Sequence, residues 1–191
     1  MYYYIYRIND TLKSKLNDIN IEELNKNEFN LIFNNKTDEI INGSINLKND
    51  ALVNDYIDFE IDLKYQFLFI ITNHQTILKK SIKIIEPFFK EQIGGELLNF
   101  LPRVSKEHEL ICRAEKFNLK FYHDGEIVDS EDDEDLEKKY CKSELSKDFI
   151  LIEADIELKN NISFIYFRKC LSISDATQKN IILNTFKQVM V

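Results

Sequence analysis

The sequence predicts an α+β fold made of two pseudo-symmetric halves, each an antiparallel β-meander of about four strands flanked by helices. Three observations support this prediction. Short segments of the first half recur in order in the second, apolar and polar residues alternate through most of them, and each set of segments precedes a helix signal. We therefore expect residues 1–94 and 95–191 to form two repeat halves packed as one compact unit.

Four pairs of segments carry the internal repeat. Residues 29–33, 39–42, 57–64 and 67–70 return as residues 117–121, 126–129, 152–159 and 162–165, with 12 of 21 positions identical. The offset between the copies changes mainly once, because the second half has eight additional residues between its second and third segments. These residues fall beside an acidic run, so the halves should differ most at one charged insertion.

Each element of the first half follows from a local pattern. Residues 10–16 form a predicted helical lead-in, and alternation with β-branched and aromatic residues predicts strands over 29–33, 39–47, 56–63 and 66–72. Pro87 and the Gly94–Gly95 pair predict the start and end of a helix over 87–93. Residues 77–85 fit either a helix or a fifth strand, and the sequence leaves both open.

The second half repeats this order. A helical lead-in over 95–101 is expected before strands over 116–122, 126–129, 149–158 and 162–169. Turn sequences before the second and fourth of these strands predict antiparallel hairpins. The last helix has a clear start, because Asp175 can cap it and Gln178 can complete a capping box. Its apolar face holds Ile182, Phe186 and Val189.

Acidic charge is concentrated in one expected loop, residues 124–137. The formal net charge is −8, from 25 basic and 33 acidic residues, and this loop holds nine acidic residues and no basic one. A local excess indicates an acidic patch and disfavours electrostatic binding of nucleic acid. A solvated loop with no partner is the alternative. The candidate binding residues at its centre are Glu131, Asp132, Asp133, Glu134 and Asp135.

Two predicted strands carry acidic stripes, in which every second residue is Asp or Glu. A period of two places each stripe on one face of its strand, opposite the core, so we expect the carboxylates to be exposed. The copies exchange Asp for Glu at every acidic position, which keeps charge but not geometry and argues against metal ligation. A solvated face that resists edge pairing is the alternative. The stripes are Asp58, Glu60 and Asp62, and Glu153, Asp155 and Glu157.

An alternative interpretation is a metal-dependent nuclease or other hydrolase. Glu157 and Lys159 form an acid-x-Lys triplet of the kind that holds a metal and assists an attacking water, and Asp148 could supply a further carboxylate. Three such triplets occur in a chain with 33 acidic residues and 21 lysines, which is no excess over chance.

The cysteines and histidines show no metal-binding or nucleophile motif. Cys112, Cys141 and Cys170 are equally spaced by 29 residues, but none lies in a C-x-x-C pair, and we attribute the spacing to chance and expect no disulfide. The i, i+4 pair of His108 and Cys112 is also interpreted as coincidence. Glycine-rich phosphate-binding motifs are also absent from the sequence. From the cysteine and histidine spacing we expect no metal, and from the missing glycine motifs we expect no cofactor.

These features favour a non-enzymatic protein-binding module or inhibitor that presents acidic surface to a basic protein partner. An immunity protein or a phage-type defence inhibitor has this physical logic, because carboxylates speed encounter with a cationic site and occupy it. We expect a cytoplasmic location, no direct nucleic-acid binding and no membrane insertion. A structural subunit that associates through its sheet edges is a second alternative. The Lys-, Asn- and Ile-rich composition suggests a low-GC bacterium or its phage.

Overall fold

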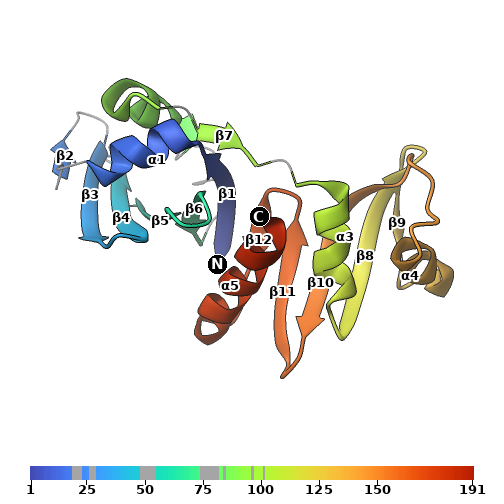
Figure 1. The fold of residues 1–191 in the computed structure, drawn as a ribbon. Coiled ribbons are helices and arrows are strands. Elements are labelled where there is room, and N and C mark those ends of the chain that lie inside the picture. The colour runs from blue at the N-terminus through green and yellow to red at the C-terminus, as the bar shows by residue number, and fades with distance from the viewer. Residues whose placement is uncertain are drawn as a thin grey trace. The chain divides into compact units, whose positions relative to one another are not determined.

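The computed structural model of the chain describes residues 1–18, 23–25, 29–47, 55–73, 82–83, 85–95, 97–100 and 102–191. The protein is a mixed α+β structure with extensive antiparallel strand pairing (Figure 1). It divides into two compact units, Met1–Phe100 and Leu101–Val191, each with its own strands and helices.

The first unit is built on antiparallel strands. Its β3 (Phe29–Lys36), β4 (Ile40–Leu47), β5 (Asp55–Asp62) and β6 (Phe67–Thr72) follow the predicted meander. β2 (Glu23–Asn25) pairs with β3, and β1 (Tyr2–Ile8) pairs with β6, so the order is β2-β3-β4-β5-β6-β1. The four predicted strands are confirmed within about three residues at each end, because the alternation that predicted them also decides which side chains enter the core.

Helices cover one face of this sheet (Figure 1). α1 (Asp10–Asn17) matches the predicted lead-in, and Asn9 caps it by accepting a hydrogen bond from the Leu12 amide at 2.8 Å. Residues 85–88 are helical and continue into the π-helix η1 (Phe89–Ile93), which ends at Gly94 with a left-handed φ of 73°. The buried contacts between these helices and strands β3 to β6 involve Leu12, Leu16, Leu31, Ile41, Ile45, Ile57, Phe59, Ile61, Leu68, Ile70, Ile85, Phe88 and Phe89.

The open choice over residues 77–85 is resolved in part. Residues 74–81 and 84 lie outside the described residues, whereas Ile85 is buried and helical. The predicted helix over 87–93 is confirmed, and it begins before Pro87.

The lead-in helix expected over 95–101 is wrong. Its place is taken by the short strand β7 (Leu97–Asn99), which pairs with β1, and the helix α3 (Val104–Cys112) begins only later. The residue before a proline is disfavoured in the helical region, and Pro102 follows this segment directly. Pro102 therefore separates an extended segment from the helix.

The second unit contains α3 and five strands: β8 (Lys116–His123), β9 (Glu126–Asp129), β10 (Ile150–Leu158), β11 (Ile162–Phe167) and β12 (Cys170–Ser172). Helix α4 (Glu134–Cys141) lies between β9 and β10 in sequence, and the chain ends in the 3-10 helix η2 (Ala176–Gln178) and α5 (Lys179–Met190). The strand order is β9-β8-β10-β11-β12, and each neighbouring pair is antiparallel. The predicted strands of this half are confirmed, with the last one shorter than expected.

The strand order of the second unit departs from the predicted meander. In the first unit, strands that follow one another in sequence are neighbours, so β4 lies between β3 and β5. In the second unit β8 lies between β9 and β10, and the short strand β9 is therefore the edge strand next to β8. The chain leaves β9 through α4 and returns to the other side of β8. The two units therefore differ in topology, and internal duplication remains an inference from sequence that the structure does not show.

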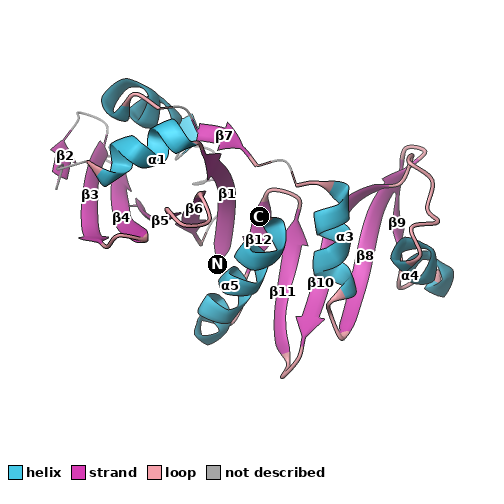
Figure 2. Ribbon diagram, viewed as in Figure 1, coloured by secondary structure: helices cyan, strands magenta, loops and turns pink. Residues whose placement is uncertain are grey.

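Helices α3 and α5 lie on the same side of the second unit's strands (Figure 2). The buried Glu107 of α3 accepts a hydrogen bond from the Tyr166 hydroxyl of β11 at 2.7 Å, and the Phe186 ring of α5 lies 6.3 Å from the Tyr166 ring. The predicted apolar face of α5 is buried, and Asp175 accepts a hydrogen bond from the Thr177 amide at the start of η2.

Among the described residues, no helix is long and apolar enough to cross a membrane.

The expected capping box of Gln178 is replaced by a tertiary contact. Its side chain accepts a hydrogen bond from the Ser163 amide at 3.1 Å and donates one to the Asn161 carbonyl at 3.3 Å. The amide group therefore ties the start of the last helix to the β10–β11 hairpin.

Candidate protein-interaction surface

The acidic run expected as a loop is largely ordered secondary structure. It contains β9, a turn over residues 130–133 and the first turn of α4. Two of its carboxylates fix the backbone: Asp129 accepts from the Glu131 amide, and Asp133 caps α4 by accepting from the Asp135 amide, both at 3.0 Å. Asp and Ser favour such local bonds to backbone amides, which is why an acidic sequence can form turns and helix starts.

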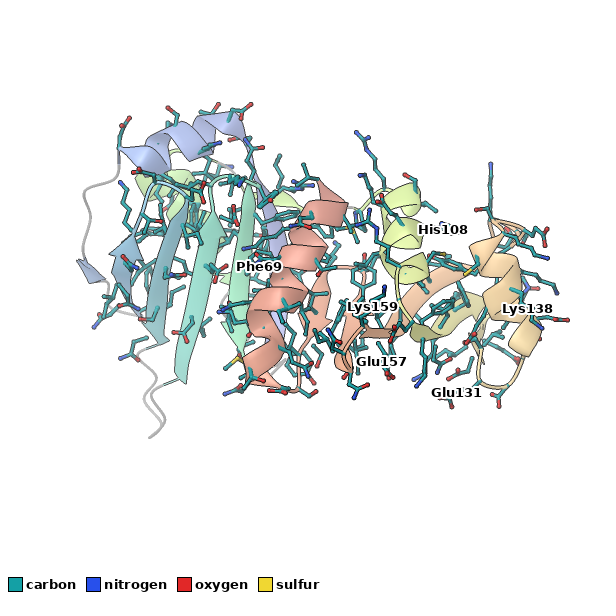
Figure 3. All side chains as sticks on the ribbon, turned by 60° about the horizontal axis from the view of Figure 1, so that its bottom comes forward. Phe69, His108, Glu131, Lys138, Glu157 and Lys159 are labelled. Carbon is teal, nitrogen blue, oxygen red and sulfur yellow. The ribbon has the colours of Figure 1, made fainter. Side chains whose placement is uncertain are left out.

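Several acids of this run face solvent. We call residues 129–135 the acidic segment. Glu131, Asp132 and Asp135 are exposed, as is the capping residue Asp133. Asp135 lies 3.8 Å from Lys138 in an ion pair whose two side chains are about two-thirds exposed. Figure 3 shows Glu131 before α4 and Lys138 on that helix. The side chain of Glu134 lies outside the described residues.

Ser130 anchors the acidic segment to the sheet. Its side chain is 2% exposed, and its hydroxyl oxygen accepts a hydrogen bond from the Leu119 amide at 2.8 Å. The same hydroxyl lies 2.5 Å from the Asn118 side-chain oxygen and 3.1 Å from a Glu137 carboxylate oxygen, so it can donate to either. A buried hydroxyl with these partners holds the turn in place.

Replacing Ser130 with alanine is therefore expected to lower the free energy of unfolding by about 1–3 kcal/mol, because the Leu119 amide loses its acceptor. Chemical denaturation followed by circular dichroism measures this change. The control is Ser146→Ala at an exposed position, which should change stability by less than about 0.5 kcal/mol. Equal effects of the two substitutions would show that Ser130 is not an anchor.

The acidic stripe on β10 shares its face with lysines from β8. Lys120 lies 2.8 Å from Glu153 and 4.0 Å from Asp129, and Lys116 lies 3.6 Å from Glu157. The hydrogen bond to Glu153 raises the pKa of Lys120. Asp155 is exposed as expected, but Glu153 and Glu157 are half-buried, so their expected exposure is wrong. The stripe is thus a mixed surface of cross-strand ion pairs rather than a purely acidic one.

The stripe on β5 is exposed in part. Asp58 is exposed and Glu60 is half-buried, but Asp62 is 5% exposed, so its expected exposure is wrong. One Asp62 carboxylate oxygen accepts a hydrogen bond from the Tyr65 amide at 2.8 Å. Asp62 ends its strand and stabilises the turn before β6, a local role that strand periodicity does not reveal.

A row of exposed apolar side chains crosses the second unit's sheet beside the acidic segment. In the strand register Tyr122 of β8 lies opposite Ile127 of β9 and also opposite Ile150 of β10. Their exposed fractions are 47%, 67% and 45%, respectively. We call these three residues the apolar row. Ile127 lies two residues before Asp129 on β9, so the apolar row and the acidic segment adjoin.

The apolar row occupies the side of the sheet that faces away from α3 and α5. Tyr166 contacts α3, so its side chain is on the helix-covered face of the sheet. Ala154 lies opposite Tyr166 and Leu119 lies opposite Ala154, so these two side chains are on the same helix-covered face. The alternating positions of β8 that include Tyr122 and Lys120 point the other way. We call this side the open face. Sequence reasoning missed the row, although the hairpin turn at residues 123–125 already places Tyr122 opposite Ile127.

The structure does not assemble the catalytic alternative. Asp148 is exposed in the turn before β10, whereas Glu157 and Lys159 lie at the far end of that strand, as Figure 3 shows for the last two. The strand from Ile150 to Glu157 alone spans about 23 Å at its usual rise per residue. Among the described residues, no group of three or more His, Cys, Asp or Glu side chains is placed to hold a metal ion.

The structure does bring two of the equally spaced cysteines together. The sulfur atoms of Cys112 and Cys141 are 3.3 Å apart, and the His108 ring lies beside Cys112. Cys170 lies on β12, and its thiol donates a hydrogen bond to the Leu171 carbonyl. Two of the cysteines whose spacing we attributed to chance, Cys112 and Cys141, are therefore in contact in the folded chain. No short sequence motif predicts that contact.

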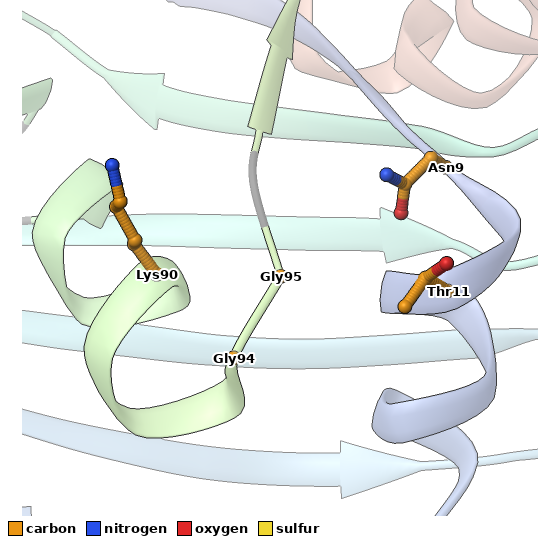
Figure 4. Close-up of a pocket in the computed structure, with 5 residues that line it drawn as sticks. All are labelled: Asn9, Thr11, Lys90, Gly94 and Gly95. Atoms are coloured by element: carbon orange, nitrogen blue, oxygen red, sulfur yellow. The ribbon is translucent and has the colours of Figure 1, made fainter.

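A pocket of about 370 Å³ lies in the first unit, between the start of α1 and the end of η1 (Figure 4). Its lining residues are Asn9, Thr11, Lys90, Gly94 and Gly95. The Asn9 side chain is already used in capping α1, and Lys15 donates a hydrogen bond to the Gly94 carbonyl at the same place. None of the predicted site residues lines this pocket.

No protein-family model matches the chain, and no curated protein matches it in sequence.

Proposed function

We propose that the second unit is a non-enzymatic protein-binding module whose open face docks a basic protein partner. The observation that carries this proposal is the apolar row, Tyr122, Ile127 and Ile150, which stands exposed beside the acidic segment. Protein interfaces combine an apolar centre that is buried on binding with a polar, charged rim. The open face has both parts.

The charge of the rim favours a cationic partner. The acidic segment offers Glu131, Asp132 and Asp135 to solvent, and Asp155 adds a further exposed carboxylate on the open face. Lys116 and Lys120 offset Glu157 and Glu153, so the ion pairs of β10 contribute little net charge. A basic partner would be attracted to the edge that carries the acidic segment, and the apolar row would then be buried beside it.

An inhibitor of a nuclease or of another cationic protein is the role that best suits this surface. Such a protein acts by occupying a basic site, and it needs no catalytic group of its own. The carboxylates of the proposed nuclease alternative lie at opposite ends of β10, so the geometry offers that function no support.

The electrostatic part is tested with a charge-matched pair of variants. Glu131→Gln, Asp132→Asn and Asp135→Asn together remove three charges from the acidic segment and leave the Asp133 cap intact. The control removes three exposed charges elsewhere in the unit, by Glu115→Gln, Glu144→Gln and Asp148→Asn. Affinity for a panel of immobilised basic proteins, measured across a salt series, should fall about tenfold with a shallower salt dependence for the first variant only.

The apolar part is tested separately. Tyr122→Ser with Ile127→Ser should weaken binding to the same panel roughly tenfold or more, because exposed aromatic and aliphatic side chains at the centre of an interface carry much of its energy. Val104→Ser is the control, since Val104 is 72% exposed on α3, away from the open face. Equal losses in the variant and control of either pair, or no binding by the unaltered chain, would contradict the proposal.

A further inference from the structure

Cys112 and Cys141 end two different helices and meet through their side chains. Cys112 is the last residue of α3, and Cys141 is the last residue of α4. The Cys112 thiol donates a hydrogen bond to the Cys141 sulfur at 3.3 Å. A disulfide bond is about 2.05 Å long, so closing this pair requires a shift of little more than 1 Å. Both residues are exposed, which leaves the sulfurs accessible to a small oxidant.

His108 completes the arrangement one helical turn before Cys112. Its Nε2 lies 3.0 Å from the Tyr140 carbonyl oxygen and 3.2 Å from that of Cys141. A carbonyl only accepts hydrogen bonds, so Nε2 carries the hydrogen in the neutral ring. Nδ1 is then free of hydrogen and lies 3.8 Å from the Cys112 sulfur, and Nε2 lies 3.6 Å from the same sulfur. The ring thus places a proton acceptor beside the thiol.

We propose that Cys112 and Cys141 form a reversible disulfide site that reacts with hydroperoxides, with His108 as the base that assists bond closure. This inference is independent of the binding function proposed above. In the first step a hydroperoxide oxidises the Cys141 thiol to a sulfenic acid, and the hydroperoxide is reduced to the corresponding alcohol, or to water in the case of hydrogen peroxide.

The second step joins the two helices. The Cys112 sulfur attacks the Cys141 sulfur, the sulfur–sulfur bond forms, and the sulfur–oxygen bond of the sulfenic acid breaks. His108 takes the thiol proton of Cys112 and returns it to the departing hydroxide, which leaves as water. Two electrons pass in total from the two thiols to the hydroperoxide. A thiol reductant reverses the bond by disulfide exchange.

A nearby base matters because Cys112 holds its proton strongly. Partial desolvation of the thiol, together with its hydrogen bond to Cys141, raises the pKa of Cys112 to about 12. The thiolate is the reactive form of cysteine, so little of it forms at neutral pH without a proton acceptor.

The test uses the full chain, reduced and then treated with hydrogen peroxide. Thiols are labelled with N-ethylmaleimide under denaturing conditions, and the labels are counted by intact mass. We expect three labels before oxidation and one afterwards, located on Cys170, with full recovery of labelling after dithiothreitol. The oxidised chain should melt roughly 10 °C higher, because the bond closes a long loop of the unfolded chain.

Three variants serve as controls. Cys170→Ser keeps the pair and should lose both of its labels, whereas Cys112→Ser should form no bond within the chain. His108→Asn retains a donor toward the Tyr140 carbonyl but no base, and it should slow bond formation roughly tenfold or more. Retention of all three labels by the unaltered chain, or a bond that includes Cys170, would overturn the disulfide site. An unchanged rate in His108→Asn would overturn the role of the histidine.

Discussion

Replacing Gly43 with alanine is expected to lower the free energy of unfolding by about 3 kcal/mol. Gly43 lies within β4 and pairs with Phe59 of β5, whose ring lies directly over it. A Cβ at this position would overlap the Phe59 ring and lie 2.5 Å from the Ile32 backbone oxygen. The ring also packs edge-on against Phe33 at 5.6 Å, and the backbone oxygen belongs to β3, so neither neighbour can move away cheaply.

Thermal and chemical denaturation measure the effect of Gly43→Ala, with Ser44→Ala as the control. Ser44 is the next residue of the same strand and points to the opposite face, so its substitution should change stability by less than about 0.5 kcal/mol. A melting temperature of Gly43→Ala equal to that of the control would show that the sheet opens easily to admit a Cβ. Such a result would contradict the tight packing of Gly43 against Phe59 and β3 in the first unit.

Alkaline pH is expected to destabilise the protein steeply. Tyr3, Tyr6 and Tyr166 are at most 1% exposed. Burial, followed by the nearby Glu60 and Asp58, raises the pKa of Tyr3 to about 12. Burial also raises the pKa of Tyr6 and of Tyr166, and Glu86 and Glu107 respectively add to these shifts. In the unfolded chain a tyrosine ionises near pH 10.

The sign of the effect follows from proton binding. Between pH 10 and 12 the folded chain keeps these protons while the unfolded chain releases them, so stability falls as pH rises. Each tyrosine contributes a slope of about 1.4 kcal/mol per pH unit, and three give about 4 kcal/mol per pH unit. Stability below pH 10 should not depend on these groups.

Urea denaturation at a series of pH values from neutral to strongly alkaline tests this expectation. Tyr3→Phe should lower the slope by about 1.4 kcal/mol per pH unit, because it deletes one titrating group and keeps the ring. Tyr122→Phe is the control at a 47% exposed position and should leave the slope unchanged. A flat stability profile above pH 10 would mean that the buried tyrosines ionise in the folded chain.

Local patterns predicted most strands because they record which side chains enter a core. The alternation in residues 56–63 gave β5, and the predicted helix starts at Asp10 and Asp175 correspond to α1 and to the η2–α5 segment. The position of β8 between β9 and β10 could not be predicted in this way. The turn at residues 123–125 specifies only the β8–β9 hairpin, whereas the other edge of β8 is filled by a strand that follows a helix.

The candidate surface was predicted less completely than the fold. Charge counting identified the acidic segment, but periodicity alone could not show that Lys120 faces Glu153 across two strands or that Asp62 caps a turn. The apolar row depends on the register of three strands, and β8 and β10 are not neighbours in the sequence. The contact between Cys112 and Cys141 depends in the same way on how α3 and α4 pack.

Helix α4 carries unlike charges at its two ends, and this has a consequence for how a partner can approach. Carboxylates precede it and begin it, while Lys138, Lys139 and Lys142 follow within two turns and are exposed. The side chains thus form a short electric dipole on the surface. A uniformly cationic rod laid along the helix would be attracted at one end and repelled at the other. Such a surface exerts a torque on an incoming molecule and selects one orientation of it before any contact is made.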